Sequence, residues 1–212
     1  MIWFTSDLHL CHDKDFVWQA RGFNDVDEMN WAIVKRWNET VYPDDDVYVL
    51  GDLILNDVEW GLKLLSKLNG YIHIIRGNHD TDAKVERYME LPNVISVEYA
   101  TIFRYKKAIF WLSHYPTITA NYDDDKPWAQ HLVNLFGHTH QTDPFYYLDK
   151  GDYYTGQQAT PNPYMYNVGV DAHNCTPISI DEIIADIRKK KEELNNEQMA
   201  NRNLNNEYMF MF

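Results

Sequence analysis

The chain has 212 residues, of which 32 are acidic and 19 basic, so its formal net charge is −13 with neutral histidines. This acidic balance argues against a broad basic surface that would bind long nucleic acids. The length and a hydrophobic content of 45% predict one globular domain and exclude a disordered chain. Two cysteines are too few for a disulfide scaffold, and the sequence shows no secretory leader and no long apolar run. We therefore expect a soluble, cytoplasmic protein without a membrane segment.

The first part of the chain alternates short apolar runs with helical patterns. Residues 2–5 form the first β-favouring run, and similar runs follow at 47–50 and 71–75. Between these runs, residues 26–39 and 57–68 repeat apolar side chains at helical spacing. Strands that alternate with helices in this way predict an α/β fold with parallel strand pairing.

The second part of the chain adds further strands, a helix and two irregular segments. Strand-like runs occur at 94–103, 108–112, 132–136, 164–170 and 177–180, and a helix is predicted over 181–194. Residues 141–164 are rich in Tyr, Pro, Gly and Gln, which predicts a long loop or flap. Residues 195–212 are rich in Asn and Glu and predict a polar, flexible tail. The predicted domain therefore spans residues 1–194.

Polar side chains follow five of the predicted strands at the point where each strand ends. In chain order they are Asp7 and His9, then Asp52, then Asn78 and His79, then His114, and finally His138 and His140. Because the carboxyl ends of strands in an α/β sheet form its ligand crevice, we expect these side chains to meet at one edge. Carboxylate, amide and imidazole ligands suit manganese, iron, zinc or nickel better than calcium or magnesium alone.

These residues belong to five short motif blocks. The blocks read Asp7-Leu8-His9, Gly51-Asp52, Gly77-Asn78-His79-Asp80, Ser113-His114 and Gly137-His138-Thr139-His140. In kind and order they resemble the motifs of the calcineurin-like metallophosphoesterases. Residues 6–9 and 167–171 are similar to those of small, stand-alone bacterial and phage phosphoesterases in this superfamily. The resemblance implies a four-layer αββα sandwich with a metal site at the carboxyl ends of the strands.

The resemblance also implies a site for two divalent metal ions. Asp7, His9 and His140 would hold the first metal, Asn78, His114 and His138 would hold the second, and Asp52 would bridge both. Two cations that share a hydroxide would hydrolyse a phosphoester, with manganese as the first candidate and iron, zinc or nickel as alternatives.

The resemblance places further residues beside the metals. His79 would stabilise phosphoryl charge or protonate the leaving group, and Asp80 would orient His79. His12 and Arg76 are further candidates for substrate contact, although His12 equally suits a helix cap and Arg76 a salt bridge.

Three functions remain open at this point. The favoured one is a metal-dependent hydrolase of small phosphoesters, preferentially phosphodiesters. A nuclease is the first alternative, and the acidic net charge disfavours it. A non-catalytic, metal-stabilised interaction module is the second, and the presence of His79 disfavours it. A protein serine/threonine phosphatase is also disfavoured, because residues 51–57 lack the arginine of that group's motif and Asp80 stands where the group has glutamate.

Overall fold

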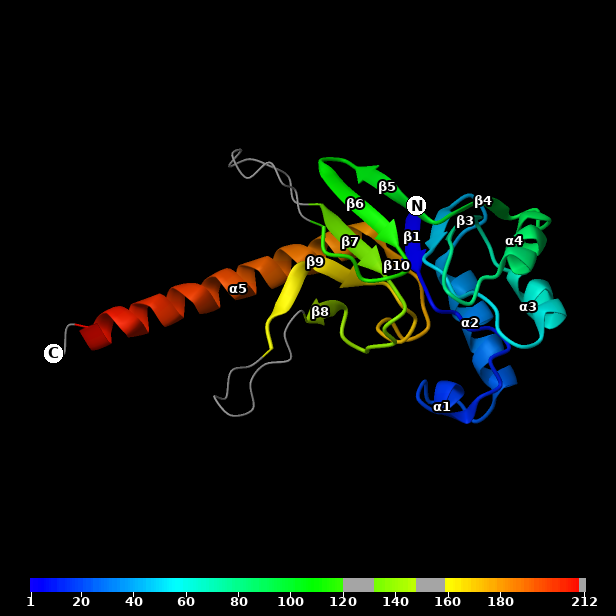
Figure 1. Ribbon diagram of the computed structural model, residues 1–212, viewed down its shortest axis with the longest axis horizontal. Coiled ribbons are helices and arrows are strands. Elements are labelled where there is room, and N and C mark those ends of the chain that lie inside the picture. The colour runs from blue at the N-terminus through cyan, green and yellow to red at the C-terminus, as the bar shows by residue number, and fades with distance from the viewer. Residues whose placement is uncertain (120–131, 148–158, 210–212) are drawn as a thin grey trace.

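The computed structural model describes residues 1–119, 132–147 and 159–209, and its centre consists of two five-stranded sheets (Figure 1). The first sheet has the order β10-β1-β2-β3-β4. Its strands are β1 (Ile2–Thr5), β2 (Asp46–Val49), β3 (Tyr71–Ile75), β4 (Val94–Glu98) and β10 (Ile178–Ser179). Strands β1 to β4 are parallel and β10 is antiparallel to β1. The carboxyl ends of β1, β2 and β3 therefore lie at the same edge.

The helices between these strands cover one face of the first sheet. They are α2 (Val26–Thr40), α3 (Val58–Leu65) and α4 (Asp82–Met89), which lie on the right in Figure 1, and the short helix α1 (Asp15–Trp18) contacts α2. The Asp25 carboxylate accepts a hydrogen bond from Glu28 N and so caps the start of α2. The apolar side of α2, including Ile33 and Trp37, packs into a core shared with Val47 of β2. This packing fixes the sheet whose edge carries the first three motif blocks.

The second sheet has the order β5-β6-β7-β9-β8. Its strands are β5 (Ala100–Tyr105), β6 (Ala108–Ser113), β7 (Val133–Phe136), β8 (Phe145–Tyr147) and β9 (Pro161–Asn167). Strands β6 and β7 are parallel, so their carboxyl ends also share an edge. A second core joins the two sheets: it contains Phe4 of β1 together with Leu112 of β6 and Leu135 of β7. The predicted α/β fold with two central sheets and flanking helices is confirmed.

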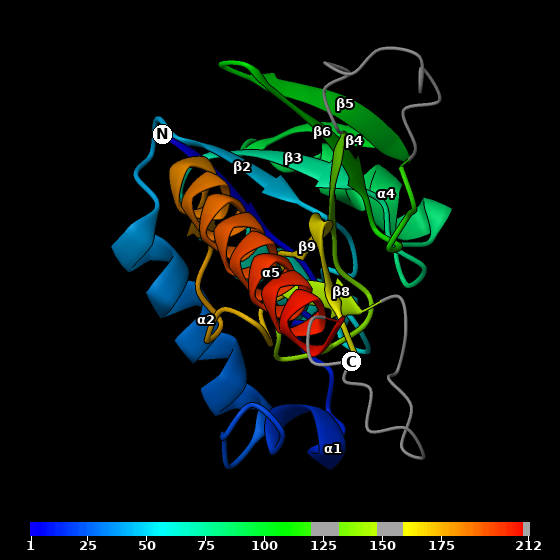
Figure 2. The same ribbon diagram turned by 90° about the vertical axis from the view of Figure 1, so that its left-hand side faces the viewer.

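Helix α5 (Ile180–Met209) follows β10 and packs beside β9 (Figure 2). Ile183 and Ile187 enter the second core, and the Tyr166 hydroxyl donates a hydrogen bond to Asp186. The helix continues past residue 194, where the sequence predicted the start of a flexible tail, and Figure 1 shows it extending away from the sheets. The continuation has a physical basis, because no Gly or Pro interrupts residues 180–209 and Lys190 pairs with Glu193 on the helix.

Other differences from the predicted elements are local. The run at 94–103 is two strands, β4 and β5, which belong to different sheets, and no Gly or Pro marks the break between them. The predicted loop at 141–164 contains β8 and the start of β9, and its residues 148–158 lie outside the described residues. Helices α1 and α4 were not predicted. Within the described residues, none of the helices combines the length and apolar composition that crossing a bilayer requires.

Candidate metal centre

Loops from both sheets bring the motif residues to one place. Asp7 and His9 follow β1, Asp52 follows β2, and Asn78 and His79 follow β3. His114 directly follows β6 in the second sheet, and His138 and His140 follow β7. The predicted gathering of strand ends therefore involves the carboxyl edges of two facing sheets rather than of one.

Two groups of side chains have the geometry of a metal-binding site. The first ligand group is Asp7, His9 and His140, and the second ligand group is Asp52, His114 and His138. Within each group, the potential ligand atoms all lie within 4.8 Å of one another. The predicted ligand Asn78 lies beside the second group, since its Oδ1 is 2.8 Å from His114 Nε2.

Asp52, a member of the second group, also lies beside the first. Its Oδ2 is 3.6 Å from His9 Nε2 of the first group and 3.5 Å from His114 Nε2 of the second. Although burial raises the pKa of Asp52, the neighbouring His9 ring and the charge of His114 lower it to about 2. Asp52 is therefore ionised at neutral pH, and its carboxylate could coordinate a cation held by His9 and another held by His114.

Two buried atoms of the first ligand group lack hydrogen-bond partners. They are Asp7 Oδ1 and His9 Nε2. Burial raises the pKa of Asp7 and lowers that of His9 to about 4, because neither charged form is well solvated there. Leaving such polar atoms buried and unpaired is costly, whereas a divalent cation between them would satisfy both. The residues present therefore fit the metal ions that the calcineurin-like motifs imply.

The backbone at the candidate ligands is held in an unusual conformation. Asp7, His9, Asp52, His138 and His140 all have positive φ, between 49° and 67°. Residues other than glycine seldom adopt this region, and such strain persists only where the surrounding structure enforces it. Strain at five candidate ligands at once is typical of a functional site.

Glycines allow the loops to approach the carboxylates closely. A Cβ atom at Gly137 would overlap Ser6 Oγ and Asp7 Oδ2, and one at Gly77 would overlap Asp52 Oδ1. The same approach lets His138 N donate a hydrogen bond to Asp7 Oδ2 at 2.9 Å. The glycines of the motif blocks thus make room for the candidate ligands.

His79 lies on the open side of the centre. Its side chain is 46% exposed, and its Nε2 is 3.9 Å from Asp52 Oδ2. Its backbone N–H donates to Asp52 Oδ1 at 2.8 Å, which holds the His79 backbone beside that carboxylate. A substrate that reached the ligand groups would therefore meet the His79 ring.

Asp80 is placed differently from the prediction that it orients His79. Its carboxylate is buried and accepts hydrogen bonds from the backbone N–H groups of Gly77, Asp52 and Leu53 and from the Tyr88 hydroxyl. None of these bonds comes from the His79 ring. The chain turns after His79, where Asp80 N bonds Gly77 O, and this turn directs the Asp80 side chain inward. Asp80 therefore ties together the two loops that carry Asp52 and Asn78.

The two candidates for substrate contact differ. His12 lies beside the centre, with its Nδ1 3.0 Å from His9 Nδ1 and the two rings stacked. Arg76 forms an ion pair with Asp82 and donates to the Tyr99 hydroxyl at 2.8 Å. Arg76 thus has the structural role of a strand-end salt bridge, and its contacts do not support a substrate role.

Two residues outside the motif blocks join the centre. His140 Nδ1 lies 2.8 Å from Asp171 Oδ2, and Asp171 is paired with Arg21. Although burial raises the pKa of Asp171, the hydrogen bonds from His140 and Arg21 lower it to about 2, so the carboxylate is ionised. The hydrogen bond to Asp171 raises the pKa of His140. The only sequence signal was the position of Asp171 at the end of the run 167–171, and nothing in the sequence marked Arg21.

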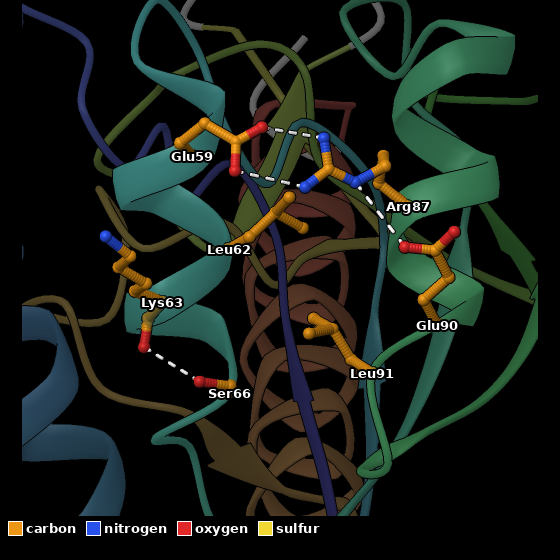
Figure 3. A pocket seen from close by; sticks show the side chains of 7 residues that line it. All are labelled: Glu59, Leu62, Lys63, Ser66, Arg87, Glu90 and Leu91. Carbon is orange, nitrogen blue, oxygen red and sulfur yellow. Dashed lines mark hydrogen bonds and ion pairs between the residues drawn. The ribbon is translucent and has the colours of Figure 1, made fainter.

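A separate surface pocket of about 280 Å³ lies between α3 and α4 (Figure 3). Arg87 forms paired hydrogen bonds of 2.7 and 3.1 Å with Glu59 across it and a 3.5 Å ion pair with Glu90. Its lining residues include none of the candidate ligands. The arginine and the two glutamates of this pocket are therefore paired with one another, and the pocket is separate from the candidate metal centre.

Comparisons with known proteins agree with the geometry. The sequence matches the family model for calcineurin-like phosphoesterases over residues 1–172. An uncharacterized protein of Methanocaldococcus jannaschii is 34% identical over 194 residues, which covers 90% of this chain and 93% of that protein. The gene 66 protein of Mycobacterium phage L5 is 27% identical over 160 residues, which covers 65% of this chain and 76% of that protein.

A solved structure shares the fold. A protein of unknown function from Aquifex aeolicus has a TM-score of 0.59 and 23% identity, covering 87% of this chain and 98% of that one. The family match extends over all five motif blocks and the whole candidate metal centre. The chain therefore belongs to the calcineurin-like phosphoesterase family and is a hydrolase that acts on phosphoesters.

Proposed function

We propose that the protein is a dinuclear metal-dependent hydrolase of small phosphoesters, preferentially phosphodiesters. The observation that carries this proposal is the position of Asp52 between the histidines of the two ligand groups, 3.6 Å from His9 and 3.5 Å from His114. A carboxylate shared in this way suits two cations about 3.5–4 Å apart, the spacing of two-metal hydrolytic sites. Manganese is our first candidate, and iron, zinc and nickel suit the same ligand types.

Each group of residues has a role in this proposal. The first ligand group would hold one cation, and the second, with Asn78, would hold the other. Bound cations supply two effects: they stabilise charge on the phosphoryl oxygens, and they activate a water molecule near neutral pH. His79, half exposed beside Asp52, is positioned to donate a proton to the leaving oxygen or to a phosphoryl oxygen. His12 supports the His9 ring and borders the same opening.

The basic side chains near the centre favour a diester over a monoester. Arg21 is paired with Asp171, Arg76 with Asp82, and Lys84 Nζ donates to the carbonyls of Ile54 and His79. A phosphomonoester carries a second negative charge at neutral pH, whereas a phosphodiester carries one. Because both arginines are already paired with carboxylates, they offer little to the second charge. The net charge of −13 also disfavours a long nucleic acid, which leaves a small substrate.

Exposed aromatic rings border the centre on both sides. The Tyr115 ring centroid is 4.6 Å from that of His138, and the Phe16 ring is 6.0 Å from that of His12. Both side chains are exposed although they are large and apolar. Such rings stack on planar groups, so an aryl or nucleoside ester would gain contact that an alkyl ester would not.

The test is hydrolysis of bis-p-nitrophenyl phosphate and p-nitrophenyl phosphate by the full chain with Mn²⁺, Ni²⁺, Zn²⁺ or Fe²⁺. We expect turnover of the diester to exceed that of the monoester, and 2′,3′- and 3′,5′-cyclic nucleotides extend the panel. His138→Ala should abolish turnover, whereas Asp181→Asn should retain it, because Asp181 pairs with Lys106 at the surface. Folded protein that binds these metals without turnover would instead favour the non-catalytic module. Cleavage of oligonucleotides with salt-sensitive binding would favour the nuclease.

A further inference from the structure

A buried arginine–aspartate pair connects segments that are distant in the sequence. Arg21 Nε donates to Asp171 Oδ1 at 2.9 Å, and Arg21 Nη2 donates to Asp171 Oδ2 at 3.1 Å. The Arg21 side chain is 2% exposed and that of Asp171 is 12% exposed. A bidentate pair with this burial has a fixed geometry, unlike the flexible ion pairs of a protein surface.

The same guanidinium group also holds the loop that carries Asp7 and His9. Arg21 Nη2 donates to Asp7 O at 2.9 Å, and Arg21 Nη1 donates to Leu8 O at 3.0 Å. On the other side of the pair, Asp171 Oδ2 lies 2.8 Å from His140 Nδ1. Arg21 and Asp171 thus connect the loop that carries Asp7 and His9 with His140.

The contact with Asp171 determines which nitrogen of His140 is free. An ionised carboxylate can only accept hydrogen bonds, so His140 Nδ1 must carry the proton. In the neutral ring the Nε2 atom then keeps its lone pair, and it lies 3.9 Å from Asp7 Oδ1. Carboxylates that hold a histidine in this way increase its basicity and orient it toward a metal.

We propose that Asp171 and Arg21 are positioning residues that fix the tautomer and orientation of His140 and thereby assemble the first ligand group. This inference rests on the proposed metal centre. It predicts an effect on one of the two metals only, because the second ligand group is oriented differently. His114 Nδ1 lies 2.8 Å from the Leu50 carbonyl, which plays for His114 the part that Asp171 plays for His140.

The experiment is a Mn²⁺ titration of the metal-free full chain by calorimetry, with bound metal counted after dialysis. We expect the wild type to bind two Mn²⁺ ions. In Asp171→Asn, one of the two affinities should fall about 10–100-fold while the other stays within about threefold. Asp181→Asn is the matched control, since it removes a carboxylate whose partner, Lys106, lies at the surface, and both its affinities should equal those of the wild type.

A second readout reports on His140 without any metal. In metal-free protein labelled with ¹⁵N-histidine, at an alkaline pH where the ring is neutral and with the signal assigned through a His140→Gln variant, His140 should carry its proton on Nδ1. In Asp171→Asn we expect a mixture of tautomers. If Asp171→Asn does not fold, Arg21→Lys carries the same test, because it keeps the charge but cannot make the bidentate contact.

The outcomes separate the two proposals. Equal losses at both metals, or no loss at either, would overturn the positioning role of Asp171 and Arg21. A wild type that binds no metal would overturn the proposed function, and the tautomer of His140 would then decide the positioning role by itself.

Discussion

Replacing Asp80 with asparagine tests whether its role is structural. Asp80 Oδ2 accepts from Gly77 N at 2.9 Å and from Asp52 N at 2.8 Å, and Oδ1 accepts from Leu53 N at 3.2 Å and from the Tyr88 hydroxyl at 3.0 Å. In Asp80→Asn, one of the two oxygens becomes an NH₂ group, which cannot accept. If that group faces Leu53 and Tyr88, the hydroxyl can rotate to accept from it, but the N–H of Leu53 loses its partner.

The expected loss of stability follows from these contacts. A hydrogen bond to a charged group contributes about 1.5–3 kcal/mol, and a buried donor without a partner costs about 1–3 kcal/mol. One lost charged bond and one unpaired donor therefore lower the free energy of unfolding by about 2.5–6 kcal/mol in Asp80→Asn. Tyr88→Phe is the matched control, since it removes one of the four bonds and leaves no backbone donor unpaired. We expect it to cost about 1.5–3 kcal/mol.

The measurement is urea unfolding of the metal-free protein, followed by tryptophan fluorescence. If Asp80→Asn lost no more stability than Tyr88→Phe, the structural role of Asp80 would be refuted. A fall in kcat at unchanged stability would restore the role predicted from the sequence, in which Asp80 orients His79. A structural role of Asp80 thus predicts a loss of stability, whereas an orienting role predicts a loss of kcat.

Three further predictions follow from the site. His79→Ala should lower kcat for the diester by about 10²–10⁴-fold at unchanged metal content, measured by steady-state kinetics and metal analysis; loss of metal would contradict the role of His79. Gly137→Ala should cost about 1–3 kcal/mol and weaken Mn²⁺ binding, because its Cβ overlaps Asp7 Oδ2. Gly22→Ala, at positive φ but in open space, should leave Mn²⁺ binding unchanged. Burial lowers the pKa of His9 from 6.5 to about 4, so between these values the unfolded chain binds a proton that the folded protein does not. The metal-free protein should therefore lose up to about 3 kcal/mol as pH falls through this window, and His9→Gln should remove that loss in urea unfolding at stepped pH.

The motif blocks made most of the candidate centre predictable from the sequence. Each block combines a strand end with a polar residue, and parallel strands bring such ends to one edge whatever the details of the loops. The direction of single side chains was not predictable in the same way. Asp80 is adjacent to His79 in the chain, yet a turn directs its carboxylate toward Asp52 and Leu53. The break between β4 and β5 was also hidden, because the apolar run continues while the chain passes from one sheet to the other.

Arg21 and Asp171 could not have been predicted, because their role exists only in the folded chain. Arg21 is 150 residues from Asp171, and Asp171 is 31 residues from His140, so no short motif contains the three. Their meeting depends on the pairing of Ser6 with Gly169, which places residues 169–171 beside the loop after β1. A local pattern can predict a ligand, but the residue that orients the ligand is selected by the tertiary structure.

The buried carboxylates change what the net charge of −13 implies for an anionic substrate. Asp80 is satisfied by four hydrogen-bond donors, and Asp171 is neutralised by Arg21. Among the described candidate ligands, the carboxylates are Asp7 and Asp52, which contribute about −2 in all when both are ionised. Two divalent cations would bring +4, so the occupied centre would carry about +2 within an acidic protein. This excess would attract one small phosphoester anion to the centre, while the surrounding surface would still repel a long polyanion.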